Sequence, residues 1–131
     1  MIKYENVFVV DDDKIYHFIL KNLLKKNNLP VTANFFENGF EAVQNLKFSI
    51  KNNNIPDLIL LDLNMPVMDG WQFLEEFKIL KATFNLMTEI HLVTSSNDIL
   101  DLKRAKIYEN EITQYYLKPI SREDIYKIFE P

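Results

Sequence analysis

The sequence predicts an α/β protein in which five strands form one doubly wound parallel sheet. Two observations lead to this fold class. Short apolar runs of the kind found in strands covered on both faces occur at residues 7–10, 58–61 and 90–93. Segments with helical spacing separate them, and strands that alternate with helices imply parallel pairing, right-handed crossovers and helices on both faces. The chain has 131 residues, so its size predicts a single domain over residues 1–131.

The remaining elements have weaker but separate signals. Two further strands are expected at residues 32–36 (TANFF) and 113–117 (TQYYL). Residues at helical spacing indicate four helices: Ile15, Phe18, Ile19, Asn22 and Leu23; Phe40, Val43, Leu46 and Lys47; Trp71, Leu74, Phe77 and Ile79 or Leu80; and Ile99, Leu102, Ala105 and Ile107. A fifth helix follows Ser121, which resembles an N-cap with acids in the next turn, and its inward residues are Ile125, Ile128 and Phe129.

The composition excludes several classes of function. The 15 basic and 19 acidic residues leave a net charge of −4, which argues against general nucleic-acid binding. The chain has no cysteine, so disulfides and thiolate sites are excluded. No apolar run approaches the roughly 20 residues of a membrane helix, and the N-terminal apolar run is too short for a signal peptide. We therefore expect a cytoplasmic protein that binds neither nucleic acid nor membrane.

The first, third, fourth and fifth predicted strands end in polar residues that could share one site, because in a doubly wound sheet the carboxyl ends of the strands form the site. Residues 11–13 are three aspartates, Asp62 follows the third strand, residues 94–96 are Thr-Ser-Ser, and Lys118 and Pro119 follow the fifth strand. Taken singly, each is more often a helix cap or a surface side chain. Their joint occurrence at four converging strand ends predicts a cleft that holds carboxylates, a hydroxyl and an ammonium.

The chemistry that fits this cleft is phosphoryl transfer to a carboxylate. Adjacent carboxylates raise one another's pKa unless a cation lies among them, and hard oxygen ligands suit Mg²⁺. Asp62 would attack phosphorus and become an aspartyl phosphate. A lysine and a hydroxyl would hold the phosphoryl oxygens, so the task of the protein is positioning and electrostatics.

The motifs VVDDD, LLDLNMPVMDGW, VTSS and YYLKPI resemble those of the receiver domain of two-component response regulators. The resemblance extends from Val7 to about Phe129. It implies a flavodoxin-like (βα)5 sandwich with the five parallel strands in the order 2-1-3-4-5, and one receiver domain over residues 1–131.

The resemblance also implies a phosphoacceptor and a metal site. Asp62 matches the phosphoacceptor, Asp12 the acid that binds Mg²⁺ directly, and Asp11 the acid that acts through water. Asn64 matches the position whose backbone carbonyl completes the metal site. Asn64 and Ser96 occupy positions that in the family tune the lifetime of the aspartyl phosphate.

A second group of residues matches the switch of the family. Thr94 matches the hydroxyl that moves toward the phosphoryl group, and Ser95 the small residue beside it. Lys118 matches the lysine that pairs first with the phosphoacceptor and then with the phosphoryl oxygen. Tyr115 matches the aromatic residue that turns inward on activation, and Pro119 implies a cis peptide bond after Lys118.

The turn after the third strand has its own physical interpretation. The sequence MPVMDG must turn sharply from strand to helix. Pro66 fixes one φ angle, and Gly70 tolerates conformations closed to other residues.

The expected function is a phosphorylation switch resembling stand-alone chemotaxis regulators, and not an enzyme beyond its own phosphorylation and slow dephosphorylation. A sensor histidine kinase or phosphotransfer protein would donate the phosphoryl group in a Mg²⁺-dependent step. The surface of the fourth helix, fifth strand and fifth helix would change, with Lys103, Arg104, Lys106 and Tyr108 as exposed candidates. Because the sequence ends at Pro131, we expect output by protein contact or phosphorelay to an unknown protein.

Three alternative functions share features with this sequence. A metal-dependent phosphatase with an aspartyl intermediate would need an acid two residues after the nucleophile, where this chain has Asn64. A flavin-binding flavodoxin would need a phosphate loop where this chain has acids. A phosphorylation-independent binding module of the same fold is the remaining alternative, although the acids, hydroxyl and lysine are all present.

Overall fold

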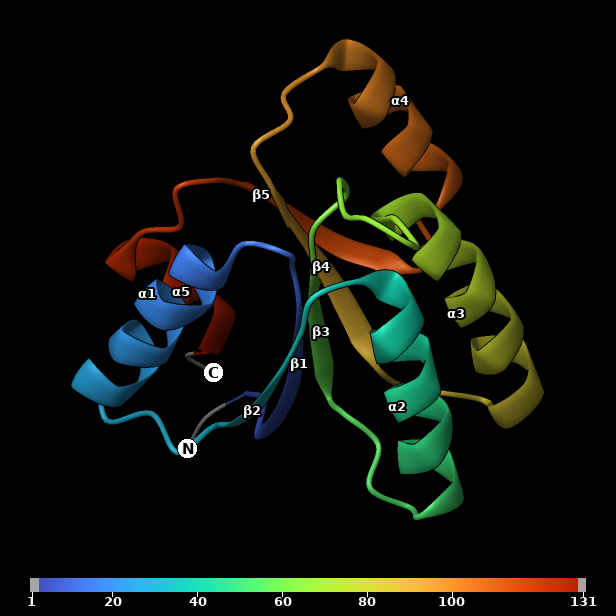
Figure 1. Cartoon of the computed structure of the whole chain (residues 1–131), viewed down its shortest axis with the longest axis horizontal. Helices are drawn as coiled ribbons and strands as arrows, with labels where there is room; N and C mark the ends of the chain where they lie inside the picture. The colour runs from blue at the N-terminus through green and yellow to red at the C-terminus, as the bar shows by residue number, and fades with distance from the viewer. Residues whose placement is uncertain (1–2, 130–131) are drawn as a thin grey trace.

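The computed structural model of the protein describes residues 3–129. Strands and helices alternate along this range (Figure 1). The elements are β1 (Asn6–Val10), α1 (Lys14–Lys26), β2 (Thr32–Phe36), α2 (Gly39–Lys51), β3 (Leu58–Leu61), α3 (Gly70–Phe84), β4 (Glu89–Thr94), α4 (Ile99–Ile107), β5 (Ile112–Leu117) and α5 (Arg122–Phe129). None of the helices in this range is long and apolar enough to cross a membrane.

The five strands form one sheet in the order β2-β1-β3-β4-β5, and every neighbouring pair is parallel. The predicted order 2-1-3-4-5 is therefore confirmed. In Figure 1, α1 and α5 lie together on one side of the sheet, and α2 and α3 lie side by side on the other. This arrangement brings the carboxyl ends of β1, β3, β4 and β5 to one edge.

The core consists of two apolar layers that share the sheet. β3 is buried along its whole length, and its side chains alternate between the layers. Ile59 and Leu61 pack in the layer under α2 and α3, whereas Leu58 and Leu60 pack in the layer under α1 and α5. A central strand covered on both faces explains why residues 58–61 are an unbroken apolar run.

The first helix is confirmed, but its buried face is not the one that the apolar spacing indicates. Ile15 and Phe18 are 72% and 66% exposed. The side chains that face the sheet are Tyr16, His17, Leu20 and Leu24. The Asp13 carboxylate accepts hydrogen bonds from the backbone N–H groups of Ile15 and Tyr16, so the helix starts directly after β1. This start sets the phase of the helix, and the more apolar stripe points outward.

The predicted helices α3 and α5 differ less from their patterns. In α3 the inward residue is Leu80 and not Ile79, beside Trp71, Leu74 and Phe77. In α5, Ser121 accepts from the Asp124 N–H, which confirms the cap. The inward residues predicted for α5 are all buried: Ile125, Ile128 and Phe129.

The fourth helix is attached to the rest of the fold only loosely. No residue of α4 is buried, and Ile99 and Ile107 are 65% and 70% exposed. In one contact between α4 and α3, the Arg104 guanidinium lies 4.8 Å from the ring centroid of Trp71. Tyr108, which was expected on the surface, is buried and stacks on the same indole at 5.8 Å.

The turn between β3 and α3 needs a glycine at position 70 for a different reason than the sequence suggests. Gly39 and Gly70, the two glycines of the described range, both have ordinary negative φ angles, so the turn does not use the conformational freedom of Gly70. The residue of this turn that has a positive φ, +67°, is Val67. A Cβ atom on Gly70 would collide with the carbonyl oxygen of Asp62 and lie 2.8 Å from the Cα atom of Leu63. The missing side chain lets the start of α3 pack on the strand end.

We predict that Gly70→Ala lowers the free energy of unfolding by about 2–3 kcal/mol, because the backbone at Asp62 has to move to admit the methyl group. Urea unfolding measures the change. Val67→Gly in the same turn is the matched control, and it should not destabilise because it relieves a β-branched residue at positive φ. Equal stability of Gly70→Ala and the wild type would contradict this account of the turn.

The two histidines are buried, His91 in β4 to 3% exposure and His17 in α1 to 8%. The His91 ring lies between Tyr4 and Tyr116, at 5.8 and 5.7 Å between ring centroids. Neither ring nitrogen of His91 has a hydrogen-bond partner within residues 3–129. Burial therefore lowers the pKa of His91 to about 4, against a small opposing effect of Glu89.

His91 should make the fold less stable in acid. The contribution of neutral His91 to the free energy of unfolding is fully present above pH 6.5, the pKa of an ordinary histidine. This contribution is lost as the pH falls toward 4, because the unfolded chain then binds a proton that the buried ring does not. We compare the free energy of unfolding of His91→Leu with that of the wild type at two pH values. Lowering the pH from 7.5 to 4.5 should shift this difference in favour of His91→Leu by up to about 2–3 kcal/mol. Taking the difference between the two proteins in urea unfolding cancels the opposite contribution of Asp62. Parallel pH profiles would rule out this role of His91.

Candidate functional site

Backbone hydrogen bonds continue past the strand ends and fix three of the predicted site residues. The Asp11 N–H donates to the Phe36 carbonyl, and the Asp62 N–H donates to the Val10 carbonyl, both at 2.9 Å. The Lys118 N–H donates to the Thr94 carbonyl at 2.9 Å. The sheet thus places two carboxylates and an ammonium at one edge, with their backbone positions set by neighbouring strands.

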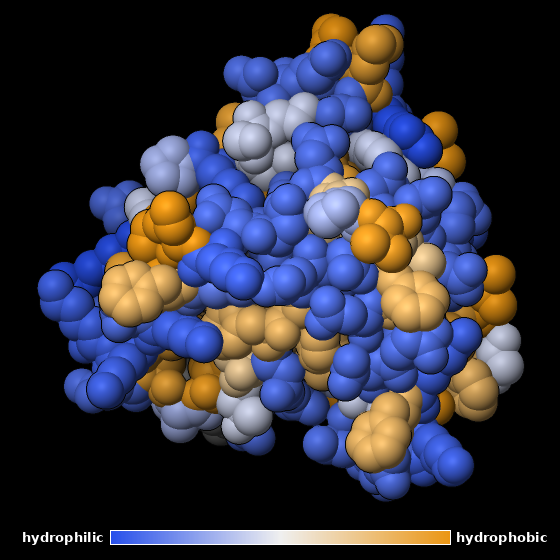
Figure 2. Space-filling model, in the orientation of Figure 1, coloured by the Kyte–Doolittle hydropathy of each residue, from blue (hydrophilic) through white to orange (hydrophobic). Residues whose placement is uncertain are grey.

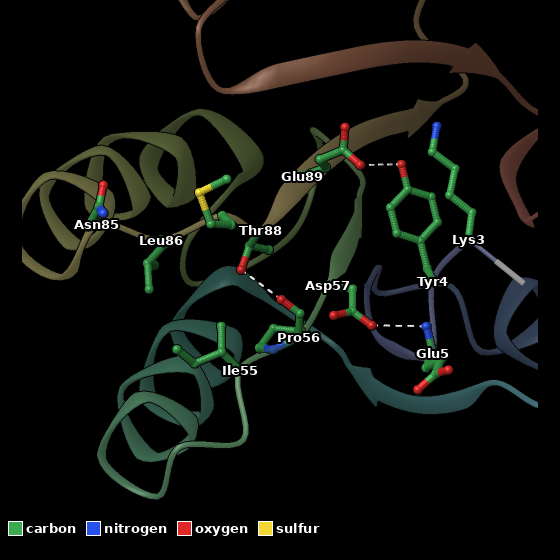
Figure 3. Close-up of a pocket in the computed structure, with 11 residues that line it drawn as sticks. Lys3, Tyr4, Glu5, Ile55, Pro56, Asp57, Asn85, Leu86, Thr88 and Glu89 are labelled. Atoms are coloured by element: carbon green, nitrogen blue, oxygen red, sulfur yellow. Dashed lines mark hydrogen bonds between the residues drawn. The ribbon is translucent and has the colours of Figure 1, made fainter. Parts of the chain in front are cut away.

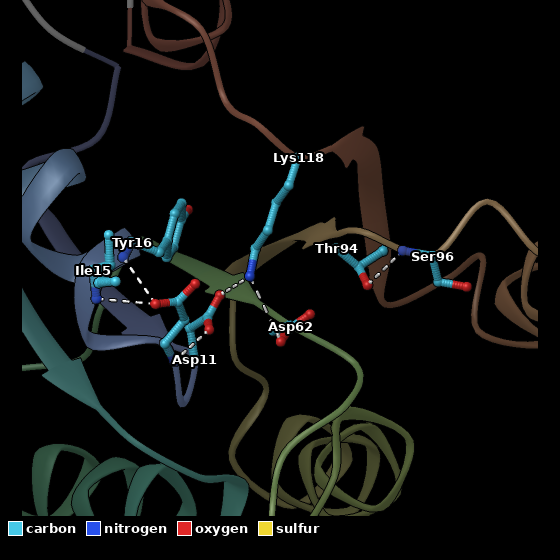
Figure 4. A network of polar contacts seen from close by, with 8 residues as sticks. Asp11, Ile15, Tyr16, Asp62, Thr94, Ser96 and Lys118 are labelled. Carbon is cyan, nitrogen blue, oxygen red and sulfur yellow. Dashed lines mark hydrogen bonds and ion pairs between the residues drawn. The ribbon is translucent and has the colours of Figure 1, made fainter.

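The centre of the cleft is an ion cluster (Figure 4). The Lys118 Nζ atom lies 2.5 Å from Oδ2 of Asp11 and 3.7 Å from Oδ2 of Asp62. Asp11 and Asp62 are only 1% and 7% exposed. Charges buried to this extent are strongly destabilising unless they are paired, so the lysine compensates for the two carboxylates. The Lys118–Pro119 peptide bond is cis.

The positive charge of Lys118 compensates only in part for the buried negative charge of Asp62. Burial, followed by the charge of Asp11, raises the pKa of Asp62 to about 6, although Lys118 acts in the opposite direction. The pKa of Asp11 is also raised by burial, against the effect of Lys118. At neutral pH the Asp62 carboxylate is therefore ionised but short of positive charge, which is the condition of a group that would gain from a further cation.

Three carboxylates at the cleft could hold a metal ion. One oxygen each of Asp11, Asp12 and Asp62 lies within 4.8 Å of the others, and Asp12 is the exposed member. Such a set of hard oxygen donors, partly open to water, fits Mg²⁺, which keeps several waters and takes one or two carboxylates. Whether Asp11 acts through water, and whether the exposed Asn64 contributes its carbonyl, stay predictions.

Asp13 has a different role from its two neighbours. It caps α1, and its own N–H donates to Oδ1 of Asp11 at 2.9 Å. This bond orients the Asp11 carboxylate so that its second oxygen faces Lys118. The third acid of the run is therefore explained by the start of the helix.

The hydroxyl side of the cleft connects to α4. Thr94 is fully buried at the end of β4, and its Oγ1 accepts from the Ser96 N–H at 3.3 Å. The Ser96 hydroxyl donates to Asp101 in the first turn of α4 at 2.5 Å, and the Tyr115 hydroxyl donates to the Ser96 carbonyl at 2.7 Å. The predicted switch residues Thr94 and Tyr115 thus meet through Ser96, whereas Ser95 points to solvent.

One residue of the cleft was missed by the sequence reasoning. Tyr16, in the first turn of α1, is 6% exposed, and its ring centroid lies 4.7 Å from Nζ of Lys118 (Figure 4). The one available signal was its spacing, since Tyr16, Leu20 and Leu24 form an i, i+4, i+8 row just after the acidic run.

A hollow at the opposite edge of the sheet has a volume of about 550 Å³ (Figure 3). Several of its polar side chains are bonded within the fold. The Tyr4 hydroxyl donates to the Glu89 carboxylate, and Asp57 accepts from the backbone of Glu5 at 2.9 Å. The Thr88 hydroxyl donates to the Pro56 carbonyl at 2.7 Å. This hollow therefore offers structural contacts, and the reactive groups lie at the other end of the strands.

Comparison with solved structures identifies the fold. A two-component response regulator from Cytophaga hutchinsonii superposes with a TM-score of 0.83 at 24% identity, over 96% of this chain and 94% of that one. The phosphorylated cyanobacterial phytochrome response regulator RcpA superposes with a TM-score of 0.77 at 25% identity, over 95% and 88%.

Comparison of sequences identifies the family. The chain is 31% identical to the sensor histidine kinase CheAY of Helicobacter pylori over 117 residues, which are 89% of this chain but 13% of that protein. It is 37% identical to the chemotaxis protein CheY of Bacillus subtilis over 76 residues, 58% of each. The family model of the response regulator receiver domain matches residues 7–130. The chain therefore belongs to the response regulator receiver domains of two-component systems, which are signalling proteins with an acidic Mg²⁺ site.

Proposed function

We propose that the protein is a phosphorylation switch that accepts a phosphoryl group on Asp62. The observation that carries the proposal is the ion cluster. A nearly buried carboxylate with a pKa of about 6 lies 3.7 Å from a lysine, beside two further aspartates that could hold a cation. An ionised, poorly solvated carboxylate of this kind is a competent nucleophile at neutral pH.

The proposed step is an in-line displacement at phosphorus. An oxygen of Asp62 forms the new P–O bond while the P–N bond of a donor phosphohistidine breaks and the imidazole leaves. A Mg²⁺ ion held by Asp11, Asp12 and Asp62 would neutralise charge on the transferred group. Lys118 then exchanges its contact with Asp62 for a phosphoryl oxygen, and the Thr94 hydroxyl donates to another oxygen.

We propose a sensor histidine kinase or a phosphotransfer protein as the donor. One support is the likeness to the Helicobacter protein, whose name states that it is a sensor histidine kinase. A second support is the outer face of α1, where Ile15, Phe18 and Ile19 are exposed, and Ile15 and Ile19 line a hollow together with Lys118. Figure 2 shows hydrophobic side chains on the surface over α1. Such a patch suits a protein partner that has to bring its phosphohistidine to Asp62. A cytoplasmic location is part of the same proposal.

The output surface would be α4, β5 and α5. A groove of about 860 Å³ runs between α4 and β5, and its apolar lining includes Ile99, Leu102 and Leu117. Because α4 has no buried residue, a small change at Thr94, passed on through Ser96 and Tyr115, would suffice to shift its position. Phosphorylation would shift the populations of two arrangements, and an unknown partner protein would bind one of them.

We predict that incubation with acetyl phosphate and Mg²⁺ adds one phosphoryl group to the wild type and none to Asp62→Asn. Both oxygens of Asp11 are engaged, one by Lys118 at 2.5 Å and one by the Asp13 N–H, whereas Asp62 lies 3.7 Å from the lysine and is freer to attack phosphorus. Intact-mass spectrometry measures the gain, and a sample with chelator in place of Mg²⁺ tests the metal requirement. No gain in a folded wild type with Mg²⁺ would favour the phosphorylation-independent binding module.

We also predict that phosphorylation changes the fluorescence of Trp71, the one tryptophan of the chain. A movement of α4 alters the distance between the Arg104 guanidinium and the indole, now 4.8 Å. The emission should change with the same time course as the mass gain and stay constant in Asp62→Asn. Arg104→Leu removes the reporting contact and should reduce the change without preventing the mass gain. A fluorescence signal unaffected by Arg104→Leu would count against movement of α4.

A further inference from the structure

We propose that Tyr16 is a positioning residue, whose ring holds the ammonium of Lys118 in place for phosphoryl transfer. The inference rests on the proposed function, because it assigns Tyr16 to the same reaction. Tyr16 acts through Lys118 and touches neither the phosphoacceptor nor the donor in this proposal.

Three side chains surround the ammonium group of Lys118. Asp11 lies at 2.5 Å and Asp62 at 3.7 Å, and the Tyr16 ring centroid at 4.7 Å forms the third side. The ring is held firmly, because Tyr16 is 6% exposed and packs in the layer between α1 and the sheet. An ammonium at this distance from an aromatic face is attracted by the ring quadrupole, and the attraction grows when water is excluded.

The contribution of the ring differs from that of the carboxylates. A cation held by Asp11 and Asp62 competes with Lys118 for the same oxygens, so both ion pairs weaken when the metal site is filled. The aromatic face is not a ligand for a hard cation such as Mg²⁺. The contact with Tyr16 therefore persists. It restrains the long flexible side chain of Lys118 when Asp11 and Asp62 are shared with the metal ion.

The working part of Tyr16 is its ring and not its hydroxyl. The hydroxyl is buried and has no hydrogen-bond partner within residues 3–129. Phenylalanine keeps the aromatic face, whereas leucine fills part of the same space without a quadrupole. The pair Tyr16→Phe and Tyr16→Leu therefore separates the interaction with Lys118 from simple packing.

The first measurement needs neither metal nor phosphoryl donor. In the metal-free protein, the ε-methylene protons of Lys118 should resonate upfield of the other lysines through the ring current of Tyr16. The upfield shift should remain in Tyr16→Phe and disappear in a folded Tyr16→Leu. An ordinary Lys118 resonance in the wild type would overturn the proposed contact.

The second measurement is the rate of phosphorylation of Asp62 by acetyl phosphate with Mg²⁺. Loss of a partly desolvated cation–π contact should slow Tyr16→Leu about fivefold, whereas Tyr16→Phe should stay within about twofold of the wild type. Phe35→Leu is a matched control, because Lys21 lies over the Phe35 ring at the same 4.7 Å on another part of α1. This control should leave the rate unchanged.

A double-mutant cycle distinguishes positioning from packing. If Tyr16 acts through the ammonium, Tyr16→Leu should cause no further loss of rate in a Lys118→Met background. An equal fivefold loss in both backgrounds, or the same loss in Tyr16→Phe, would overturn the inference while the proposed function stands. A wild type that is not phosphorylated at all would instead overturn the proposed function.

Discussion

The cleft depends on the attraction between one ammonium and two nearly buried carboxylates. Removing Asp11 and Asp62 from water destabilises their charged forms, and Lys118 offsets only part of that effect, as the raised pKa of Asp62 shows. The fold thus holds the Asp62 carboxylate in a state that a further cation would stabilise. The same shortage of positive charge underlies both the proposed nucleophilic role of Asp62 and the suitability of the site for Mg²⁺.

Two parts of the fold differ in rigidity, and the difference follows from their contacts. On the rigid side, backbone hydrogen bonds extend past β1, β3 and β5 and fix the charged residues, while Gly70 lets α3 pack directly on the Asp62 carbonyl. On the less constrained side, α4 buries none of its residues, and its contacts with the fold include Ala105 on the core, Arg104 on Trp71 and Asp101 with Ser96. Precise chemistry requires the first arrangement, and a change of shape requires the second.

Much of this architecture could be predicted from the sequence, and the errors have physical causes. The strand order and the convergence of Asp11, Asp62, Thr94 and Lys118 follow from residue patterns and a family resemblance. The buried face of α1 did not, because apolar spacing cannot show which of two stripes the cap at Asp13 turns toward the sheet. The role of Gly70 did not follow from the sequence either. A side chain at this position would collide with the Asp62 carbonyl, and such a tertiary contact is not visible in a local sequence pattern. Tyr16 was missed for the same reason, since its partner Lys118 lies 102 residues further along the chain.

The cleft and helix α4 are connected at the end of β4. Thr94 ends this strand with its side chain fully buried, and the next hydrogen bonds lead through Ser96 to Asp101 in α4 and to Tyr115 in β5. A shift of the Thr94 hydroxyl toward a new anion would disturb the Ser96 N–H bond, and with it the backbone that both α4 and Tyr115 hold. Coupling between sites typically amounts to about 1–3 kcal/mol. A helix held by a few exposed contacts can be moved by an energy of this size, whereas a helix packed into the core could not.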